Sequence, residues 1–290
     1  MVRLVRAAGM GVRRGLQPER VRPPLYDGSV IDDLLFGQPS NLVMRGVQAY
    51  GRRRRVAGGA TTVVVVNWNT VDVLRVTLAA VRRYSPPETE IIVIDNGSTD
   101  ASWTWLSSRP HGCRAIRLPV NIGHGKALDI GFALASNEVV VTLDSDAFPY
   151  RQNWLEVIRE PMDGGNKDAA GMWGRRDRLH PACAAYRRST FYDTRMSMAN
   201  HATWIDTGEE PVFLENCWDT GELVFMSIGP GQVHLFPIDH TPHGGLTMAD
   251  VVYHHEAYTT MTVLGTDERD ASAHAPGWAA AVAALLPDPG

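Results

Sequence analysis

The strongest constraint on the fold is a regular alternation of short apolar runs and amphipathic segments between residues 60 and 144. The first run, "TTVVVVNWN", begins at Thr61 and contains four consecutive valines. A short, continuous β-branched run is typical of a strand that is buried on both faces of a sheet. Three further runs follow: "EIIVID", "RAIRL" and "EVVVTL", the last of which leads into Asp144. Strands that alternate with helices predict a parallel sheet, so we expect an α/β fold.

The segments between these runs have the pattern of helices. Thr70 is suited to cap a helix that the sequence Ser85-Pro86-Pro87 would end. The apolar residues of this segment share one helical face: Val73, Leu74, Leu78 and Val81. We expect further helices near 101–107 and over about 126–135. After residue 150 the pattern is less regular, which predicts an irregular α+β region.

The chain divides into four segments on these patterns. Residues 1–58 form an Arg-rich extension in which the apolar residues of 27–50 predict one or two helices that dock on the main domain or on a second subunit, so a homodimer is open. Residues 59–150 form the regular half of the main domain and 151–265 its irregular half, while 266–290 form a C-terminal tail or helix.

The charge balance bears on possible partners. With 28 Lys and Arg against 32 Asp and Glu, the net charge of −4 provides no global field for a polyanion, which argues against nucleic acid as the principal partner. The first 60 residues are nevertheless rich in arginine, including the run Arg52 to Arg55. These arginines are either solvated side chains on an extension or a peripheral contact with anionic lipid headgroups or a phosphorylated acceptor.

Cysteine usage and hydropathy bear on location. Cys113, Cys183 and Cys217 are odd in number and far apart, so we interpret them as reduced thiols. No apolar run has the length of a membrane span, and the N-terminus lacks the apolar stretch of a signal peptide. We expect a cytoplasmic protein.

Polar segments follow each of the four predicted strands. They are Asn67-Trp68-Asn69, "DNGSTD", "PVNIGHGK" and "DSDAF". Ligands of parallel sheets lie beyond the carboxyl ends of the strands, so these segments are where we expect the chemistry.

The D-x-D of Asp144, Ser145 and Asp146 is the strongest candidate for a metal site. Two carboxylates at the end of a buried strand repel each other unless a cation lies between them, and hard oxygen ligands select Mg²⁺ or Mn²⁺. The alternative is an N-cap for a helix that starts near Arg151.

The four elements together resemble the family two glycosyltransferases of the GT-A fold. They are "VVVVNWN", "VIDNGSTD", "NIGHGKALDIG" and "VVVTLDSD", in this order, and they cover residues 61 to 150, about a third of the chain. The resemblance implies a GT-A (Rossmann-like), mostly parallel sheet flanked by helices. It also implies an inverting, metal-dependent hexosyl- or deoxyhexosyltransferase. Its donor would be a UDP or dTDP sugar and its acceptor a hydroxyl of a small molecule or glycan, with the donor on 59–150 and the acceptor on 151–265.

The resemblance also implies roles for individual residues. Asp95 would hydrogen-bond the nucleotide base, Asp146 would bind Mn²⁺ or Mg²⁺ directly, and Asp144 would bind the ribose or support the metal through water. Lys126 is either a further contact to the diphosphate or a surface lysine. Asp129 departs from the family, which often has Asn there. The remaining expected donor contacts are Asn67, Trp68, Asn69, Asn121 and Ser145.

An inverting transfer needs one general base, and the segment "CWDTGELVFMSIGPGQVHLFP" resembles the part of the family that supplies it. It predicts an acid, a helix, a glycine turn and a strand. Asp219 is our choice for the base, with Glu222, Glu215 and Asp206 as rivals. The same acids would otherwise serve as helix caps and surface charge.

A late histidine completes the metal site in some relatives, and "VVYHHEAY" is similar to that context. His254 is the better candidate and His255 the second, although such clusters are also often polar surface. Five aromatic residues are candidates for lining an acceptor cleft, with core packing as the alternative for each: Trp173, Tyr186, Phe191, Trp204 and Trp218.

Other classes fit the sequence less well. A P-loop would need Gly at Val120 and Ser or Thr at Ala127. A sugar-nucleotide pyrophosphorylase-like nucleotidyltransferase would have a glycine-rich loop in place of Asn67-Trp68-Asn69. A processive synthase would need membrane spans and Q-x-x-R-W, and a glycoside hydrolase has no need of the donor pattern. A catalytically silent partner subunit that binds sugar nucleotides stays open.

Overall fold

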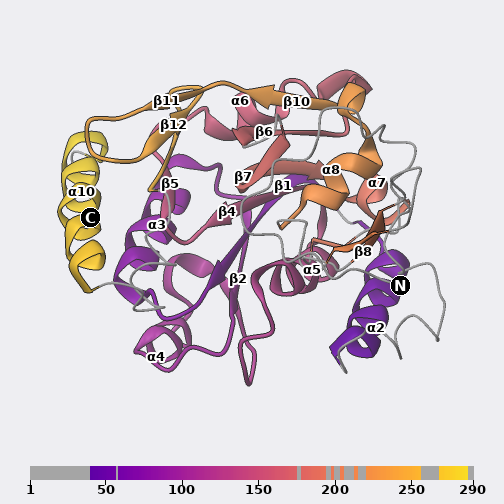
Figure 1. Ribbon diagram of the computed structural model, residues 1–290, viewed down its shortest axis with the longest axis horizontal. Helices are drawn as coiled ribbons and strands as arrows, with labels where there is room; N and C mark the ends of the chain where they lie inside the picture. Colours follow the sequence, from indigo (N-terminus) through magenta and orange to yellow (C-terminus); the bar gives the residue numbers. More distant parts are fainter. Residues whose placement is uncertain are drawn as a thin grey trace.

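A seven-stranded sheet with helices on both faces forms the centre of the molecule (Figure 1). The computed structural model describes residues 40–56, 58–174, 178–193, 197–198, 203–205, 212–214, 220–255 and 268–286. The α/β class expected from the sequence is confirmed.

The helices of the described residues, in chain order, are α2 (Ser40–Arg53), α3 (Val71–Tyr84), α4 (Ser102–Leu106), α5 (His124–Leu134), α6 (Trp154–Arg159), α7 (Arg188–Asp193), α8 (Glu222–Ile228) and α10 (Glu268–Leu285). Single 3₁₀ turns are η2 (Pro110–Gly112), η3 (Asp163–Gly165) and η5 (Pro230–Gln232). The strands are β1 (Gly58–Asn67), β2 (Glu90–Asp95), β3 (Arg114–Arg117), β4 (Asn137–Asp144), β5 (Ala147–Pro149), β6 (Ala169–Gly174), β7 (Arg178–Arg187), β8 (Thr203–Ile205), β9 (Val212–Leu214), β10 (Val233–Phe236), β11 (Ile238–His240), β12 (Leu246–Met248) and β13 (Val252–His254).

The central sheet is mostly parallel, as the alternation of strands and helices predicted. Its order is β10-β6-β7-β4-β1-β2-β3, and β7 runs antiparallel to both of its neighbours. Across β1 and β2, Asn67 pairs with Asp95, and across β1 and β4, Val66 pairs with Asp144. The polar segments after these three strands therefore meet at one edge of the sheet.

The valine run of β1 is buried because this strand lies between two separate cores. Val63 and Val65 pack into the core formed with α3, α6 and α10, while Val64 and Val66 pack into the core formed with α5, α7 and α8. Successive side chains of a strand point to opposite faces. A strand that is covered on both faces therefore carries a continuous apolar run in place of alternating apolar and polar residues. Cys113 and Cys183 both lie in the first of these cores as free thiols.

The start of α3 differs from the prediction in one respect. The helix begins after Thr70 and ends at Tyr84, as expected, but the Thr70 side chain makes no capping hydrogen bond. Its hydroxyl instead forms hydrogen bonds with the side chains of Asn67 and Ser145. The free N–H of Val71 at the start of the helix donates to the Asp100 carboxylate. The cap comes from a distant loop because Thr70 is used to join the ends of β1 and β4.

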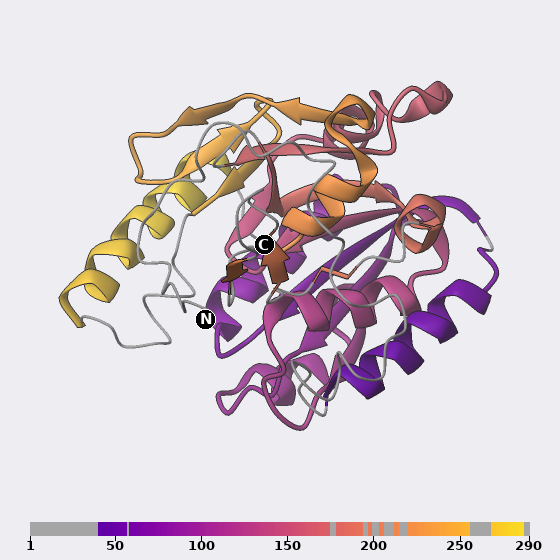
Figure 2. The same ribbon diagram turned by 45° about the vertical axis from the view of Figure 1, so that its right-hand side comes forward.

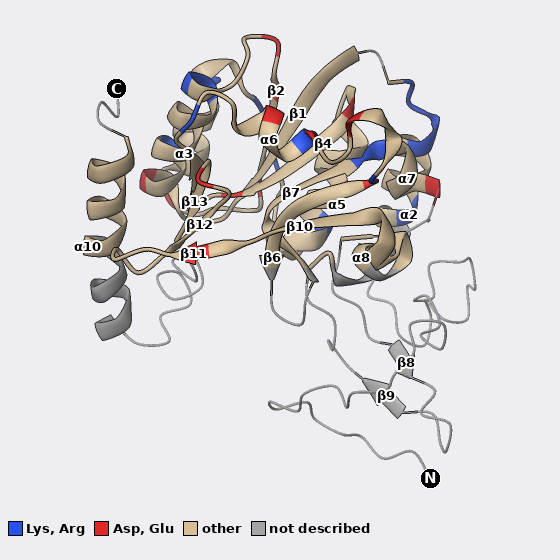
Figure 3. Cartoon of the chain, turned by 90° about the horizontal axis from the view of Figure 1, so that it is seen from above, with Lys and Arg blue, Asp and Glu red and all other residues tan. Residues whose placement is uncertain are grey.

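Helix α2 docks against α5, and two arginines fix the chain that follows it. Arg54 donates to the carbonyl of Leu134 and to the hydroxyl of Ser136, and Arg188 donates to the carbonyls of Gly51 and Arg54. The arginines of 52–55 are therefore not all solvated side chains: Arg54 is half-buried and holds the helix in place, whereas the other three are exposed. In Figure 3 the cartoon is blue, the colour of Lys and Arg, where α2 ends at Arg52 and Arg53.

A second, four-stranded sheet has the order β11-β12-β13-β5, and α10 covers it on the side of the molecule opposite to α2 (Figures 1 and 2). Trp278 of α10 packs edge-to-face on Phe148 of β5, with the ring centroids 5.3 Å apart.

Among the described helices, none combines the length and the apolar character that crossing a bilayer requires.

A tight contact between β6 and β7 gives a test of this packing. Gly171 of β6 faces Ala184 of β7, and a Cβ at Gly171 would lie 2.6 Å from the Ala184 Cα and from the Cys183 carbonyl oxygen. Because these are backbone atoms, we expect Gly171→Ala to lower the free energy of unfolding by about 1–3 kcal/mol. Urea unfolding measures the change.

Gly59→Ala is the matched control, since a Cβ there meets nothing within 4 Å. Equal unfolding midpoints for Gly171→Ala and Gly59→Ala would contradict the close approach of β6 to β7.

Candidate functional site

The D-x-D segment forms the turn between β4 and β5. Asp144 is the last residue of β4, and β5 begins directly after Asp146. Two threonines hold this segment in place. Thr77 of α3 donates to the Ser145 carbonyl at 2.7 Å, and Thr70, directly before α3, donates to the Ser145 hydroxyl at 3.2 Å. The alternative interpretation as a helix N-cap is wrong, because a strand stands between these acids and α6, which starts at Trp154.

His254 lies beside both aspartates. Its strand, β13, pairs with β5 so that His254 is opposite Ala147, and the next residue donates its N–H to the Asp146 carbonyl. The His254 Nε2 is 3.6 Å from the Asp146 Oδ1 and 3.8 Å from the Asp144 Oδ2. One ligand atom from each of the three residues lies within 4.8 Å of the other two. The sheet therefore assembles the predicted trio from positions 110 residues apart.

His255, the second candidate, does not face the aspartates. Its Nδ1 is 2.6 Å from the Tyr253 hydroxyl, and its ring packs edge-to-face against Trp278 of α10. The prediction of His255 as a rival ligand is thus corrected: alternate residues of β13 point to opposite sides, so Tyr253 and His255 share the side that is covered by α10. Burial raises the pKa of Tyr253 to about 12, with the charge of Asp146 as a smaller cause.

Two further histidines, which we did not assign from the sequence, lie at this corner. The Nε2 of His124, the first residue of α5, is 3.5 Å from the Asp144 Oδ1. The ring of His180 on β7 is 5.4 Å from the ring of His254. His124 lies within the N-x-G segment and was open to prediction. His180 carries no local signal, because the pairing of β7 with β4 places it there.

The loops after β1 and β2 are joined around a buried carboxylate. Asn67 donates to the Asp95 Oδ1 at 3.3 Å and to Ser98 at 3.2 Å. The Asp95 Oδ2 is buried and accepts no hydrogen bond from the described residues, although the Arg117 Nε lies 3.9 Å away. Asn67 is itself fully buried, so it shapes this loop from within and does not present its amide to solvent.

Gly97 explains the glycine of "DNGS". Its φ is +75°, and a Cβ there would lie 2.4 Å from the Val120 carbonyl carbon and 2.6 Å from the Asn121 N. Asn96 donates to the Asn121 side chain at 2.9 Å, which ties this loop to the N-x-G segment. The two segments therefore form one surface, and a side chain at position 97 would separate them.

The other expected donor contacts lie around this surface. The side chain of Asn69 accepts hydrogen bonds from the N–H groups of Thr99 and Asp100, so it holds the loop after β2. Trp68 and Lys126 are half-buried, and Asn121 is exposed. Burial lowers the pKa of Lys126, and the nearby Asp129 opposes that shift.

The described candidates for an acceptor cleft differ in exposure. Trp173, near the end of β6, is 41% exposed. Tyr186 and Phe191 are buried core residues and not the expected cleft residues: Tyr186 packs edge-to-face on Phe132, and Phe191 stacks on the same ring. Tyr186 lies on β7, which is covered on both faces. Trp204 is on β8, but its side chain is outside the described residues, as is the whole of Trp218.

The region of the proposed general base is described only from residue 220. Asp219, Glu215 and Asp206 lie outside the described residues, and so does the side chain of Glu222, the first residue of α8. The predicted order of helix, glycine turn and strand is present as α8, Gly229 and β10.

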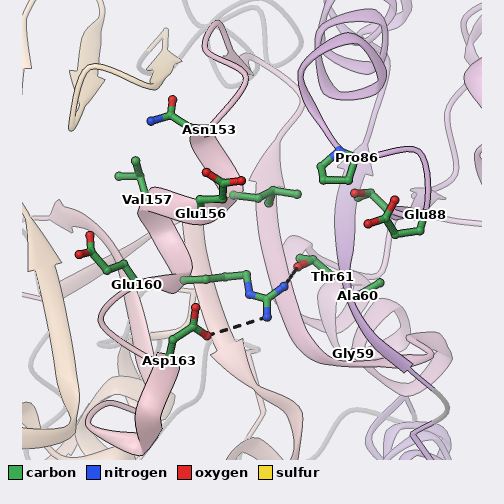
Figure 4. A pocket seen from close by; sticks show the side chains of 13 residues that line it. Gly59, Ala60, Thr61, Pro86, Glu88, Asn153, Glu156, Val157, Glu160 and Asp163 are labelled. Carbon is green, nitrogen blue, oxygen red and sulfur yellow. Dashed lines mark hydrogen bonds and ion pairs between the residues drawn. The ribbon is translucent and has the colours of Figure 1, made fainter.

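A cavity of about 680 Å³ lies at the other end of β1, away from the D-x-D (Figure 4). Arg159 crosses it, donating to Thr61 at 3.0 Å and lying 3.9 Å from Asp163. The remaining charged side chains that line it are Glu88, Glu156 and Glu160. This hollow is at the amino ends of the strands, away from the polar groups that converge at their carboxyl ends, so its volume alone does not make it the functional site.

Asp129, where the resemblance led us to expect Asn, is fully buried in α5. It accepts hydrogen bonds from the Met198 N–H at 2.8 Å and from the Ser197 hydroxyl, and Gln48 of α2 also bonds to it. Burial raises its pKa from the ordinary 3.8 to about 7, against these hydrogen bonds and the charge of Lys126. Tyr192 of α7 is the other titratable group that interacts with it.

A mostly parallel sheet with a D-x-D pair at the carboxyl end of a central strand is the arrangement of a GT-A type glycosyltransferase domain. Residues 62–205 match the family model described as glycosyl transferase family 2, and the chain belongs to this family.

Individual relatives match over short segments. The chain is 36% identical over 81 residues to poly-beta-1,6-N-acetyl-D-glucosamine synthase of Staphylococcus epidermidis, which is 27% of this chain and 20% of that protein. It is 32% identical over 88 residues to an uncharacterized glycosyltransferase of a Nostoc species, which is 29% of this chain and 27% of that protein. The crystal structure of S. aureus TarS, residues 1–349, is similar with a TM-score of 0.48 and 14% identity, covering 79% of this chain and 73% of that chain.

Asp129→Asn should make the free energy of unfolding less dependent on pH between about 4 and 7. Because the pKa of Asp129 is raised on folding, the folded chain holds a proton in this range that the unfolded chain has released. Stability is therefore lost as the pH rises through the range, and Asn, which does not titrate, escapes this loss. The advantage of the variant should grow toward neutral pH, to at most about 4 kcal/mol.

Urea unfolding at about pH 4.5, 6 and 7.5 measures this trend. Asp239→Asn, which changes an exposed carboxylate of β11, is the control and should follow the wild type. A difference between Asp129→Asn and the wild type that stays constant with pH would contradict the raised pKa.

Proposed function

We propose that this chain transfers a sugar from a nucleoside diphosphate sugar to a hydroxyl group of an acceptor, with inversion at the anomeric carbon. The observation that carries the proposal is the convergence of Asp144, Asp146 and His254 at the carboxyl end of β4. We further propose that these three residues hold Mn²⁺ or Mg²⁺.

The ligand set fits such an ion. The Asp144 Oδ1 is buried and accepts no hydrogen bond from the described part of the chain, although a carboxylate oxygen removed from water needs a donor or a cation. Two carboxylates suit Mg²⁺ and Mn²⁺, and the imidazole of His254 adds a softer ligand that favours Mn²⁺. A bound ion would neutralise the charge that develops on the departing diphosphate.

Asp95 supports a pyrimidine donor. Its carboxylate ends β2, next to the end of β1, and Asn67 orients it. A carboxylate only accepts hydrogen bonds when ionised, so it suits the N3–H of uracil or thymine, which favours a UDP or dTDP sugar. The half-exposed Arg117 lies with its Nε 3.9 Å from the other oxygen of this carboxylate, Oδ2.

Membership in glycosyl transferase family 2 supports the reaction class. The named relative in Staphylococcus epidermidis is a synthase of an N-acetylglucosamine polymer. An inverting transfer needs one carboxylate to take the proton of the acceptor hydroxyl, and we propose Asp219, by resemblance, for this role. The acceptor would be a small molecule or a glycan bound to the half of the domain after residue 150.

Asp146→Asn and His254→Ala should each weaken Mn²⁺ binding by at least about tenfold, the lower end of the loss seen even for groups that only orient metal ligands. Calorimetric titration with Mn²⁺, with UDP present, measures this. His240→Ala is the control, because this exposed histidine of β11 lies outside the trio.

Mn²⁺ dependence that is unaltered in His254→Ala would contradict a metal role for this residue. The same titrations with UDP, dTDP and GDP sugars, followed by assays of donor hydrolysis and transfer, test the donor. Binding without hydrolysis or transfer would favour a silent binding subunit over an enzyme.

Asp219→Asn should leave donor binding almost unchanged and reduce turnover at least about a hundredfold, because the amide no longer takes the acceptor proton. Steady-state transfer rates and donor titrations measure the two effects separately. Glu222→Gln, three residues along the chain, is the comparison and should keep most of the turnover. Near-normal turnover in Asp219→Asn would remove this residue from the mechanism.

A further inference from the structure

The carboxylate of Asp129 joins elements that are far apart in the sequence. It belongs to α5, and its two oxygens accept hydrogen bonds from Ser197 and Met198, 68 and 69 residues later in the chain. Asp129, Ser197 and Met198 are all buried. A carboxylate removed from water is costly unless donors surround it, so this cluster has a defined geometry that an apolar contact would not impose.

Met198 connects Asp129 to the start of α8. Its carbonyl accepts the N–H of Gly221 at 3.1 Å, and Gly221 is the N-cap of α8 with a φ of +77°. The Met198 side chain, which is fully buried, packs against the same glycine: a Cβ there would lie 3.5 Å from the Met198 Cε. The start of α8 is thus held by both the backbone and the side chain of Met198.

The first residue of α5 lies at the D-x-D corner. This residue, His124, lies 3.5 Å from Asp144, and Asp129 is five positions along the same helix. A helix transmits position rigidly over such a distance, which is about one and a half turns. One connected path therefore runs from Asp144 through α5, Asp129 and Met198 to the first turn of α8.

We propose that Asp129 is a positioning residue that sets the start of α8 relative to α5, and thereby relative to the D-x-D corner. The part of the inference that concerns catalysis rests on the proposed function: Asp219, the proposed base, precedes Gly221 by two residues in the sequence. The structural part stands without it.

The essential feature is an oxygen that accepts the Met198 N–H. Asp129→Asn keeps such an oxygen, and its amide N–H₂ can donate to the Ser197 hydroxyl. Asp129→Ala keeps neither, so the Met198 N–H loses its partner, and Met198, with the Gly221 amide bonded to it, is free to shift. Ser197→Ala removes one bond to the carboxylate and leaves the bond from Met198.

Amide hydrogen exchange followed by NMR tests the structural part at about neutral pH. In Asp129→Ala we expect the Gly221 amide to exchange at least about tenfold faster, while amides of β1 such as that of Val64 change much less. In Asp129→Asn and Ser197→Ala we expect Gly221 to stay within a few-fold of the wild type. If Asp129→Ala does not fold, Asp129→Leu, which also lacks an acceptor, takes its place.

Three results would overturn the inference. An unchanged Gly221 amide in Asp129→Ala would show that α8 does not depend on this carboxylate. Equal acceleration at Gly221 and Val64 would show that the variant is only less stable as a whole. An effect of Ser197→Ala as large as that of Asp129→Ala would also contradict it, because the path runs through Met198.

Turnover tests the catalytic part. In Asp129→Ala we expect the transfer rate to fall at least about tenfold while the dissociation constant of the Mn²⁺–nucleotide complex stays within about twofold, and Asp129→Asn should restore the rate. Equal losses of binding and rate would contradict a positioning role. If the wild type shows no transfer at all, the proposed function fails, and the exchange experiment still decides whether Asp129 positions α8.

Discussion

The parallel pairing of β1 with β2 on one side and β4 on the other is the constraint on which the rest of the structure depends. It aligns Asn67 with Asp95 and Val66 with Asp144, so three separate polar segments end at one edge of the sheet. The pairing is stable because β1 carries valines toward two cores at once. The apolar interior and the polar edge are therefore two consequences of the same strand, and a shift of register would destroy both.

At that edge, the structure is determined by charged and polar side chains and not by apolar packing. Asp144 and Asp146 are separated by one residue and are held in a largely buried turn, where like charges raise the free energy of the folded state. The structure places His124 of α5 and His254 of β13 beside these carboxylates, and the hydroxyls of Thr70 and Thr77 hold Ser145 between them. A corner that concentrates negative charge in this way is suited to a divalent cation and, through it, to a diphosphate.

Buried polar groups also connect parts of the chain that are far apart in the sequence. Arg188, at the start of α7, reaches the carbonyls at the end of α2, and Asp129 in α5 holds Met198, which accepts the N–H of Gly221 at the start of α8. Each of these groups would be costly in an apolar core without its partners, and each has several. Such contacts specify relative position more sharply than apolar packing does, because hydrogen bonds depend on direction.

The sequence by itself determined the regular half of the protein. Continuous β-branched runs, helical periodicity and the polar segments after each strand follow local rules, so β1 to β4, α3 and the D-x-D at the end of β4 were predictable to within a few residues. His254 was predictable as a candidate from its context. The sequence could not decide between His254 and His255, because that depends on which side of β13 faces the aspartates. The cap of α3 by Asp100, the burial of Tyr186 and the approach of His180 to His254 were decided only by tertiary structure. These features come from contacts between residues 29 or more positions apart or from packing between sheet and helices, and no local pattern encodes a contact whose partner is supplied by the fold.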